Sequence, residues 1–137
     1  MIHLVTGGSG SGKSAYAEQC ILDFGGTRRV YIATMQPFGA EGQARIARHR
    51  KMRAAKQFST IECYTNLKEV ELEPGSDVLL ECMSNLTANE IFDPSGAGKA
   101  RAEEEILAGV SRLAHQARNL VLVTNEIFSD GYRYEEE

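Results

Sequence analysis

The stretch that most limits how this chain can fold is the glycine-rich segment GGSGSGKS, residues 7–14, which directly follows the short apolar run IHLVT, residues 2–6. It satisfies the pattern GxxxxGK[ST], and a helical pattern begins at Lys13. Small residues let successive backbone N–H groups surround phosphate oxygens, and a helix start adds partial positive charge. The segment therefore predicts a strand, a phosphate-binding loop and a helix, rather than a flexible turn that ends in Lys-Ser by chance.

Three side chains are expected to carry chemistry with this loop. Lys13 would reach the β- and γ-phosphates of a nucleotide, and the Ser14 hydroxyl would ligate Mg²⁺. Glu81 follows the apolar run VLL and is expected to support the metal as a second oxygen donor. The alternative is that Glu81 is an ordinary acidic residue at a strand end. The loop residues predicted to bind nucleotide are Gly7, Gly8, Ser9, Gly10, Ser11, Gly12, Lys13 and Ser14.

Short apolar runs alternate with longer segments of helical periodicity along the chain. This alternation predicts one α/β domain, residues 1–137, with a mainly parallel sheet flanked by helices. Several of the runs are almost continuously apolar, as strands covered on both faces are. The expected strands are residues 2–6, 29–34, 59–64, 77–82 and 120–124, and the expected helices are residues 13–24, 41–56, 84–92 and 99–118.

Composition excludes several classes of protein. A net charge of −4 argues against a protein that coats nucleic acid or anionic membrane. The cysteines are three in number and form no CxxC pair, which argues against a disulfide framework or a zinc site and favours the reducing cytoplasm. No window approaches the ~18 apolar residues of a membrane span. We therefore expect a cytoplasmic protein with no membrane span and no nucleic-acid partner.

Positive charge is concentrated in one segment, because six of the fifteen Lys and Arg residues lie between Arg45 and Lys56. If residues 41–56 form a helix, Arg45, His49 and Arg53 occupy positions i, i+4 and i+8 and lie along one stripe, with Arg50 beside it. Guanidinium groups beside an imidazole would offset charge that builds up on an attacked phosphate. The pattern suits a histidine that accepts a phosphoryl or nucleotidyl group, but also a solvated basic face, a patch for an acidic ligand or a packed histidine.

Four blocks of sequence, taken together, resemble one enzyme family. They are LVTGGSGSGKSAYAE, VYIATMQPFGAEGQARIARHRKMRAAKQFSTIE, VLLECMSNLTANEIF and LVLVTNEIF. In this order they are similar to the bifunctional adenosylcobinamide kinase/adenosylcobinamide-phosphate guanylyltransferases of cobalamin biosynthesis. The middle block is the most specific, since the family pattern is met by Arg45, Ile46, His49, Arg50, Arg53, Thr60 and Glu62.

The resemblance implies a RecA-like P-loop NTPase fold and two reactions at one site. Adenosylcobinamide would be phosphorylated with ATP or GTP, and GMP would then pass from GTP, through a covalent GMP on His49, to give adenosylcobinamide-GDP. The corrinoid is thus the implied small-molecule partner, and the implied catalytic residues are His49 and Lys13. The resemblance also implies that Thr34, Arg50, Arg53, Glu62 and Glu81 contribute to nucleotide and metal binding.

One departure from the family pattern, at the C-terminus, qualifies the resemblance. Family members continue through a further helix and strand where this chain stops at TNEIFSDGYRYEEE, so we expect a C-terminally shortened sheet with an exposed edge. The family also implies a homo-oligomer, a trimer with nucleotide sites near the subunit contacts. Asn125 and Glu126 resemble a family pair at the rim of the site, or are simply a polar strand end.

The alternative functions for the chain are a plain P-loop kinase in which His49 has no role, and an inactive nucleotide-binding or interaction module.

Overall fold

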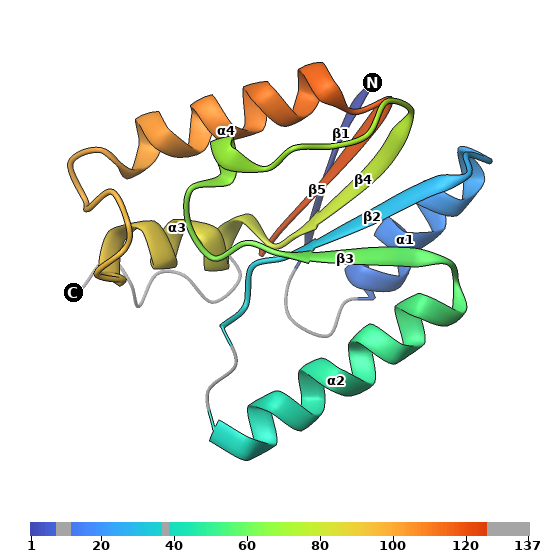
Figure 1. The fold of residues 1–137 in the computed structure, drawn as a ribbon, viewed down its shortest axis with the longest axis horizontal. Coiled ribbons are helices and arrows are strands. Elements are labelled where there is room, and N and C mark those ends of the chain that lie inside the picture. Colours follow the sequence, from blue (N-terminus) through green and yellow to red (C-terminus); the bar gives the residue numbers. More distant parts are fainter. Residues whose placement is uncertain (8–11, 37–38, 126–137) are drawn as a thin grey trace.

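The computed structural model describes residues 1–7, 12–36 and 39–125, and it confirms the predicted α/β class. Every predicted strand and helix is present, with ends that differ by three residues or fewer (Figure 1). In chain order the elements are β1 (Ile2–Gly7), α1 (Lys13–Asp23), β2 (Arg28–Ala33), α2 (Gly39–Ala55), β3 (Phe58–Glu62), the short 3₁₀ helix η1 (Leu67–Glu69), β4 (Ser76–Glu81), α3 (Met83–Phe92), α4 (Ala102–Gln116) and β5 (Asn119–Asn125).

The described strands form one parallel sheet of five strands in the order β1-β5-β4-β2-β3. The last strand of the chain, β5, therefore lies between β1, which leads into the glycine loop, and β4, which ends at Glu81. Gly7 is paired with Asn125, and Glu81 with both Val123 and Ala33. The carboxyl ends of the strands thus share one edge of the sheet, where ligands of open α/β sheets bind.

Helices cover the two faces of the sheet and bury a separate apolar cluster on each. On one face, Leu80 and Leu122 pack with residues of α3 and α4 such as Leu86 and Leu113. The opposite face packs against α1 and includes Tyr31. Strand β4 is buried along almost its whole length, and its central residues Val78, Leu79 and Leu80 are apolar, as expected for a strand covered on both faces. Each face of the sheet therefore contributes to a buried core of its own.

The outer strands of the described sheet are β1 and β3. On β1, Leu4 is 62% exposed and Ile2 is 56% exposed, so part of an apolar face is uncovered there. The expected shortening of the sheet stays a prediction, because residues 126–137 lie outside the described residues. Among the helices of the described ranges, none is both long and apolar enough to cross a membrane.

Candidate active site

The described residues that flank the glycine loop are placed as the sequence predicts, since Gly7 ends β1 and Lys13 begins α1. Gly12 has a φ of 84°, in the left-handed region that glycine adopts without the steric cost of a Cβ. Lys13 is the first residue of α1 and Ser14 is the second. Both side chains therefore stand at a helix N-terminus, where the backbone favours anions. Gly8, Ser9, Gly10 and Ser11 lie outside the described residues.

Glu81 is connected to this helix start by hydrogen bonds. The Ser14 hydroxyl donates to Oε2 of Glu81, and the Tyr31 hydroxyl donates to Oε1 over 3.1 Å. Burial, followed by the negative charge of Glu81, raises the pKa of the Tyr31 phenol far above its usual value, so the phenol stays a donor at neutral pH. The carboxylate is thus held beside Ser14, and its support of a metal stays a prediction.

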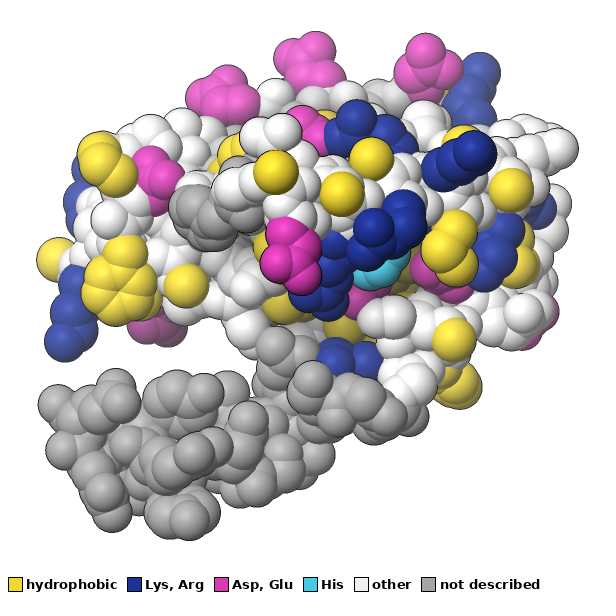
Figure 2. All heavy atoms as spheres, turned by 90° about the horizontal axis from the view of Figure 1, so that it is seen from below, with side chains coloured by type: hydrophobic (Ala, Val, Ile, Leu, Met, Phe, Trp, Pro, Cys, Tyr) yellow, Lys and Arg dark blue, Asp and Glu magenta, His cyan; other side chains and the backbone are white. Residues whose placement is uncertain are grey.

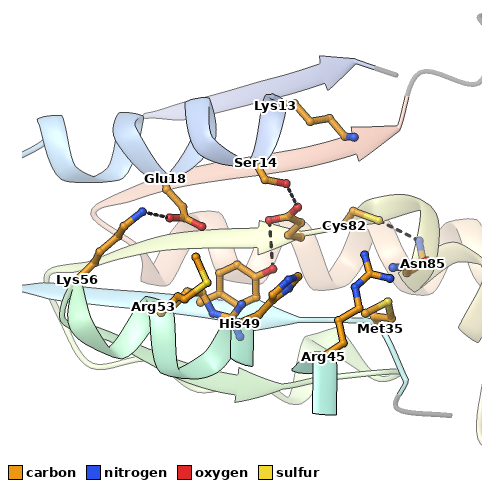
Figure 3. A pocket seen from close by; sticks show the side chains of 13 residues that line it. Lys13, Ser14, Glu18, Met35, Arg45, His49, Arg53, Lys56, Cys82 and Asn85 are labelled. Carbon is orange, nitrogen blue, oxygen red and sulfur yellow. Dashed lines mark hydrogen bonds and ion pairs between the residues drawn. The ribbon is translucent and has the colours of Figure 1, made fainter. Parts of the chain in front are cut away.

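A cavity of about 460 Å³ opens at this carboxyl edge between α1 and α2. Lys13 and Ser14 lie on one side of it, and Arg45, His49 and Arg53 lie on the other (Figure 3). The predicted stripe on α2 therefore faces the predicted phosphate-binding helix. The remaining described residues that line the cavity are Glu18, Tyr31, Met35, Met52, Lys56, Glu81, Cys82 and Asn85.

Arg53 is the most deeply placed residue of the α2 stripe. It is 6% exposed, and its guanidinium carbon lies 3.6 Å from the centroid of the Tyr31 ring. This cation–π contact orients the planar group against the sheet. Its Nε is buried without a hydrogen-bond partner among the described residues. Because a buried donor of this kind costs free energy when it has no partner, Arg53 is suited to an anionic ligand.

Of the basic side chains of α2, Arg45 and Arg53 line the cavity, whereas Arg48, Arg50 and Lys51 do not. In the view from below, Lys and Arg side chains gather around a histidine over the face that α2 presents (Figure 2). Lys56, near the end of the helix, is paired with Glu18 of α1 over 2.7 Å. This pair joins the two walls of the cavity and uses up two of its charges. Lys13, Arg45 and Arg53 also line the cavity and place positive charge where a polyphosphate would meet it.

The cavity also contains a thiol. Burial raises the pKa of Cys82, and its sulfur accepts a hydrogen bond from the backbone N–H of Asn85 over 3.5 Å, which caps α3. A thiol whose pKa is raised is mostly protonated at neutral pH and is a poor nucleophile. Tyr31 is kept protonated in the same way. Of the three side chains, the exposed imidazole of His49 is the best placed nucleophile.

Thr34 does not line this cavity. The residue is fully buried, and its hydroxyl both accepts from the backbone N–H of Cys82 and donates to the Cys82 carbonyl, each over 2.8 Å. These bonds connect the end of β2 to the start of α3. The described contacts of Thr34 are thus structural, and its implied part in nucleotide binding stays a prediction.

Arg50 and Glu62 also lie away from the cavity. They form an ion pair with each other and line a shallow hollow between α2 and β3, together with Ala54, Phe58 and Thr60. Arg50 directly follows His49 on the helix, so its side chain leaves α2 about 100° around the axis. The structure therefore does not bring these two residues together with Lys13 and His49. Their implied part in nucleotide binding likewise stays a prediction.

Sequence reasoning missed several residues that line the cavity. Tyr31 lies within an apolar strand and reads as an ordinary core residue. Asn85 gave one usable signal, because a polar residue three positions after a strand end can reach the carboxyl edge of a sheet. Asn125 ends β5 and is paired with Gly7, whereas Glu126 lies outside the described residues, so the part of this pair at the rim of the site stays a prediction.

Oxygen donors for Mg²⁺ are present at the predicted place. The Ser14 hydroxyl and the Glu81 carboxylate are adjacent, since they are hydrogen-bonded to each other. The described residues contain no group of three or more His, Cys, Asp or Glu side chains that could hold a metal by themselves. Mg²⁺ in nucleotide enzymes is bound through one or two protein oxygens together with phosphates and water. The two donors therefore fit Mg²⁺ that arrives with a nucleotide.

Comparison with known proteins identifies the family of the chain. The family model described as "Cobinamide kinase / cobinamide phosphate guanyltransferase" matches residues 3–135. The chain is 35% identical over 140 residues to the bifunctional adenosylcobalamin biosynthesis protein CobU of Escherichia coli strain K12, and 36% identical over 140 residues to CobU of Salmonella typhimurium; each alignment covers 93% of this chain and 76% of the relative. A CobP protein of Pseudomonas aeruginosa is 33% identical over 131 residues, with 92% of this chain and 72% of the relative covered. The resemblance predicted from the sequence is confirmed, and the chain belongs to the cobinamide kinase/cobinamide phosphate guanyltransferase family.

Proposed function

We propose that this chain performs both reactions named in the description of its family at the cavity between α1 and α2. One is the phosphorylation of cobinamide with ATP or GTP, and the other is the transfer of GMP from GTP to cobinamide phosphate. The observation that supports this most is that His49 lines the same cavity as Lys13 and Ser14. A nucleotide whose phosphates lie at the start of α1 would be within reach of the imidazole, and a kinase reaction alone gives that imidazole no role.

In the kinase reaction, the hydroxyl of the aminopropanol arm of cobinamide attacks the γ-phosphorus of the nucleotide. The bond between the γ-phosphorus and the β–γ bridging oxygen breaks, the nucleoside diphosphate leaves, and the hydroxyl proton is lost to solvent. Lys13 offsets the charge on the β- and γ-phosphates. Ser14 and Glu81 would hold Mg²⁺, which supplies further neutralisation of phosphate charge when bound.

In the second reaction, a ring nitrogen of His49 forms a bond to the α-phosphorus of GTP. The bond between that phosphorus and the α–β bridging oxygen breaks, and pyrophosphate leaves. A phosphate oxygen of cobinamide phosphate then attacks the same phosphorus, which breaks the N–P bond, restores the imidazole and yields cobinamide-GDP. Arg45 and Arg53, one turn before and one turn after His49, offset the charge that develops on the phosphorus oxygens.

Incubation with Mg²⁺ and GTP labelled at the α-phosphate tests this assignment. We expect the denatured protein to retain label that acid releases and alkali does not, as for a phosphoramidate. His49→Ala should lose the label and keep the phosphorylation of cobinamide. His115→Ala is the matched control, because His115 is on α4 and its Nδ1 lies 2.7 Å from the Ser111 carbonyl oxygen.

The other outcomes separate the alternatives. Loss of both activities in a folded His49→Ala protein would mean that His49 serves nucleotide binding, and the two-role assignment would be wrong. A folded wild-type protein that binds GTP and phosphorylates cobinamide without taking up label would be a plain kinase. Binding of GTP with neither activity would indicate an inactive nucleotide-binding module.

The setting of these reactions is also part of the proposal. The three cysteines are unpaired, which supports a reducing compartment such as the cytoplasm. We propose a homo-oligomer, in line with the trimer that the resemblance implies. The hollow beside the outer strand β3 that contains the Arg50–Glu62 pair offers a surface for such contacts. Sedimentation analysis of the purified protein measures this state directly.

A further inference from the structure

A second groove opens beside the nucleotide cavity, between α2 and α3. It has a volume of about 440 Å³ and is lined by Ile46 on α2 and Ala88 on α3, among others. Met35, Arg45 and Asn85 line both the groove and the cavity. The same three side chains lie close to one another at the end of the cavity away from Lys56 (Figure 3). The two spaces therefore meet at these three residues.

The lining of the groove combines apolar surface with side-chain amides. Met35, Ile46 and Ala88 provide the apolar surface, and Gln36, Asn85 and Asn89 provide the amides. The described residues that line it include no aromatic side chain and no carboxylate. A second nucleotide would lack a ring on which its base could stack, and a metal ion would lack charged donors. The lining instead suits a large amphipathic ligand that carries amides.

The amides on the walls are held in place before any ligand binds. The side-chain nitrogen of Gln36 donates to Asp93 over 2.7 Å, and that of Asn89 donates to the Thr34 carbonyl over 2.7 Å. Both bonds connect the segment after β2 with α3. No hydrogen bond among the described residues uses the amide oxygens of Gln36 and Asn89, so these remain as acceptors for N–H groups of a ligand. A groove built in this way loses little conformational entropy on binding.

We propose that this groove binds the corrinoid acceptor, with an edge of the corrin ring and its amide side chains between α2 and α3. This inference rests on the proposed function, because it assigns the second substrate of the same site. The aminopropanol arm runs past Arg45 toward His49, one helical turn away, where the two side chains are neighbours on one face. Arg45 lies at the junction and pairs with the phosphate of the acceptor in the second reaction.

Ala88→Trp tests the groove, because the bulky ring would fill it from the exposed surface of α3. Gly42→Trp fills it from α2 and serves as an independent second variant. Thr87→Trp is the matched control, since Thr87 is exposed on the same helix and does not line the groove. For each protein we would measure the Kd of cobinamide by equilibrium dialysis, using its visible absorption, and the labelling of His49 by GTP.

We expect both groove variants to raise the Kd of cobinamide by about tenfold or more, which corresponds to ~1.4 kcal/mol, while Thr87→Trp leaves it unchanged. Label from GTP should still appear on the groove variants, because neither Gly42 nor Ala88 lines the nucleotide cavity. An unchanged cobinamide Kd in both variants, with labelling intact, would overturn the groove and leave the proposed function standing. A wild-type protein that neither takes up label nor binds cobinamide would overturn both.

Discussion

The guanidinium carbon of Arg53 lies 3.6 Å from the centroid of the Tyr31 ring, and the Tyr31 hydroxyl donates a hydrogen bond to Glu81 on the neighbouring strand β4. One aromatic side chain therefore contacts both the basic helix α2 and the carboxylate beside Ser14. The walls of the cavity are linked through the floor of the sheet as well as through the exposed Lys56–Glu18 pair. A change at Tyr31 should consequently affect both sides of the site.

Tyr31→Phe should remove the hydrogen bond to Glu81 and keep the ring beneath Arg53. We expect the free energy of unfolding to fall by about 1 kcal/mol in urea titrations. Tyr31→Leu also removes the cation–π contact and should cost about 1 kcal/mol more. Equal losses in the two variants would show that the ring contributes nothing beyond its hydroxyl.

The same residue gives a prediction for pH. Because burial and Glu81 raise the pKa of the Tyr31 phenol, it stays protonated well into the alkaline range. Its raised pKa means that any stability it contributes is present below the ordinary phenol pKa and is lost only above it. Wild type and Tyr31→Phe should therefore show kinase pH profiles of the same shape up to about pH 9. An alkaline limb present only in the wild type would contradict this.

Arg53→Met should preserve most of the side-chain volume and remove the buried charge next to His49. We expect the rate of His49 labelling by GTP to fall by roughly 100-fold, because a cation that offsets charge in the transition state is lost. Arg48→Met is the matched control on the same helix, since Arg48 is exposed and does not line the cavity. Equal rates in the two variants would exclude a direct role for Arg53.

Glu81→Gln should keep the shape of the side chain and remove its charge. If Glu81 supports Mg²⁺ together with Ser14, the Mg²⁺ concentration for half-maximal kinase rate should rise by roughly 10- to 100-fold. Titration of the kinase rate with Mg²⁺ measures this. Glu71→Gln removes an exposed carboxylate outside the cavity and provides the control. An unchanged Mg²⁺ requirement would leave Glu81 as an ordinary acidic strand end.

A charge swap distinguishes a structural from a nucleotide-binding role for Arg50 and Glu62. If the pair acts only by holding α2 to β3, Arg50→Glu and Glu62→Arg should each lower the free energy of unfolding. The double variant, in which the two charges are exchanged, should regain most of that free energy. Because the pair is half exposed, the coupling should be no more than about 1 kcal/mol. Loss of GTP binding in the stable double variant would instead support the role that the family resemblance implies.

Cys82 should react slowly with alkylating agents in the folded protein. Burial raises the pKa of its thiol, so the thiolate is scarce at neutral pH and becomes more abundant only as the pH rises above the ordinary thiol range. Peptide mapping after iodoacetamide treatment at several pH values measures this residue separately from Cys20 and Cys63. Rapid modification of Cys82 at neutral pH would show that the thiol is more exposed or more acidic than the structure indicates.

The positions of the strands and helices, and the residues expected on the two walls of the cavity, could be predicted from the sequence. Strand and helix positions follow from short-range periodicity, and the glycine loop follows from a local pattern that only a strand–loop–helix unit satisfies. The stripe of Arg45, His49 and Arg53 required only the helical repeat, and the structure confirms that all three line one cavity. These features depend on residues close to one another in the chain.

Tertiary structure alone decided which neighbours meet. Strand β5 lies between β1 and β4 in the sheet. Its pairing with β1 joins segments more than a hundred residues apart in the chain, and no local pattern encodes such a pairing. The rotation of α2 about its axis turns Arg53 onto Tyr31 and leaves Arg50 on Glu62, although both arginines follow His49 within one turn. Packing between distant segments also decides that the Thr34 hydroxyl is buried and hydrogen-bonded to the backbone of Cys82. The direction in which a helix face or strand end points is set by packing between distant segments, and that packing is a property of the whole fold.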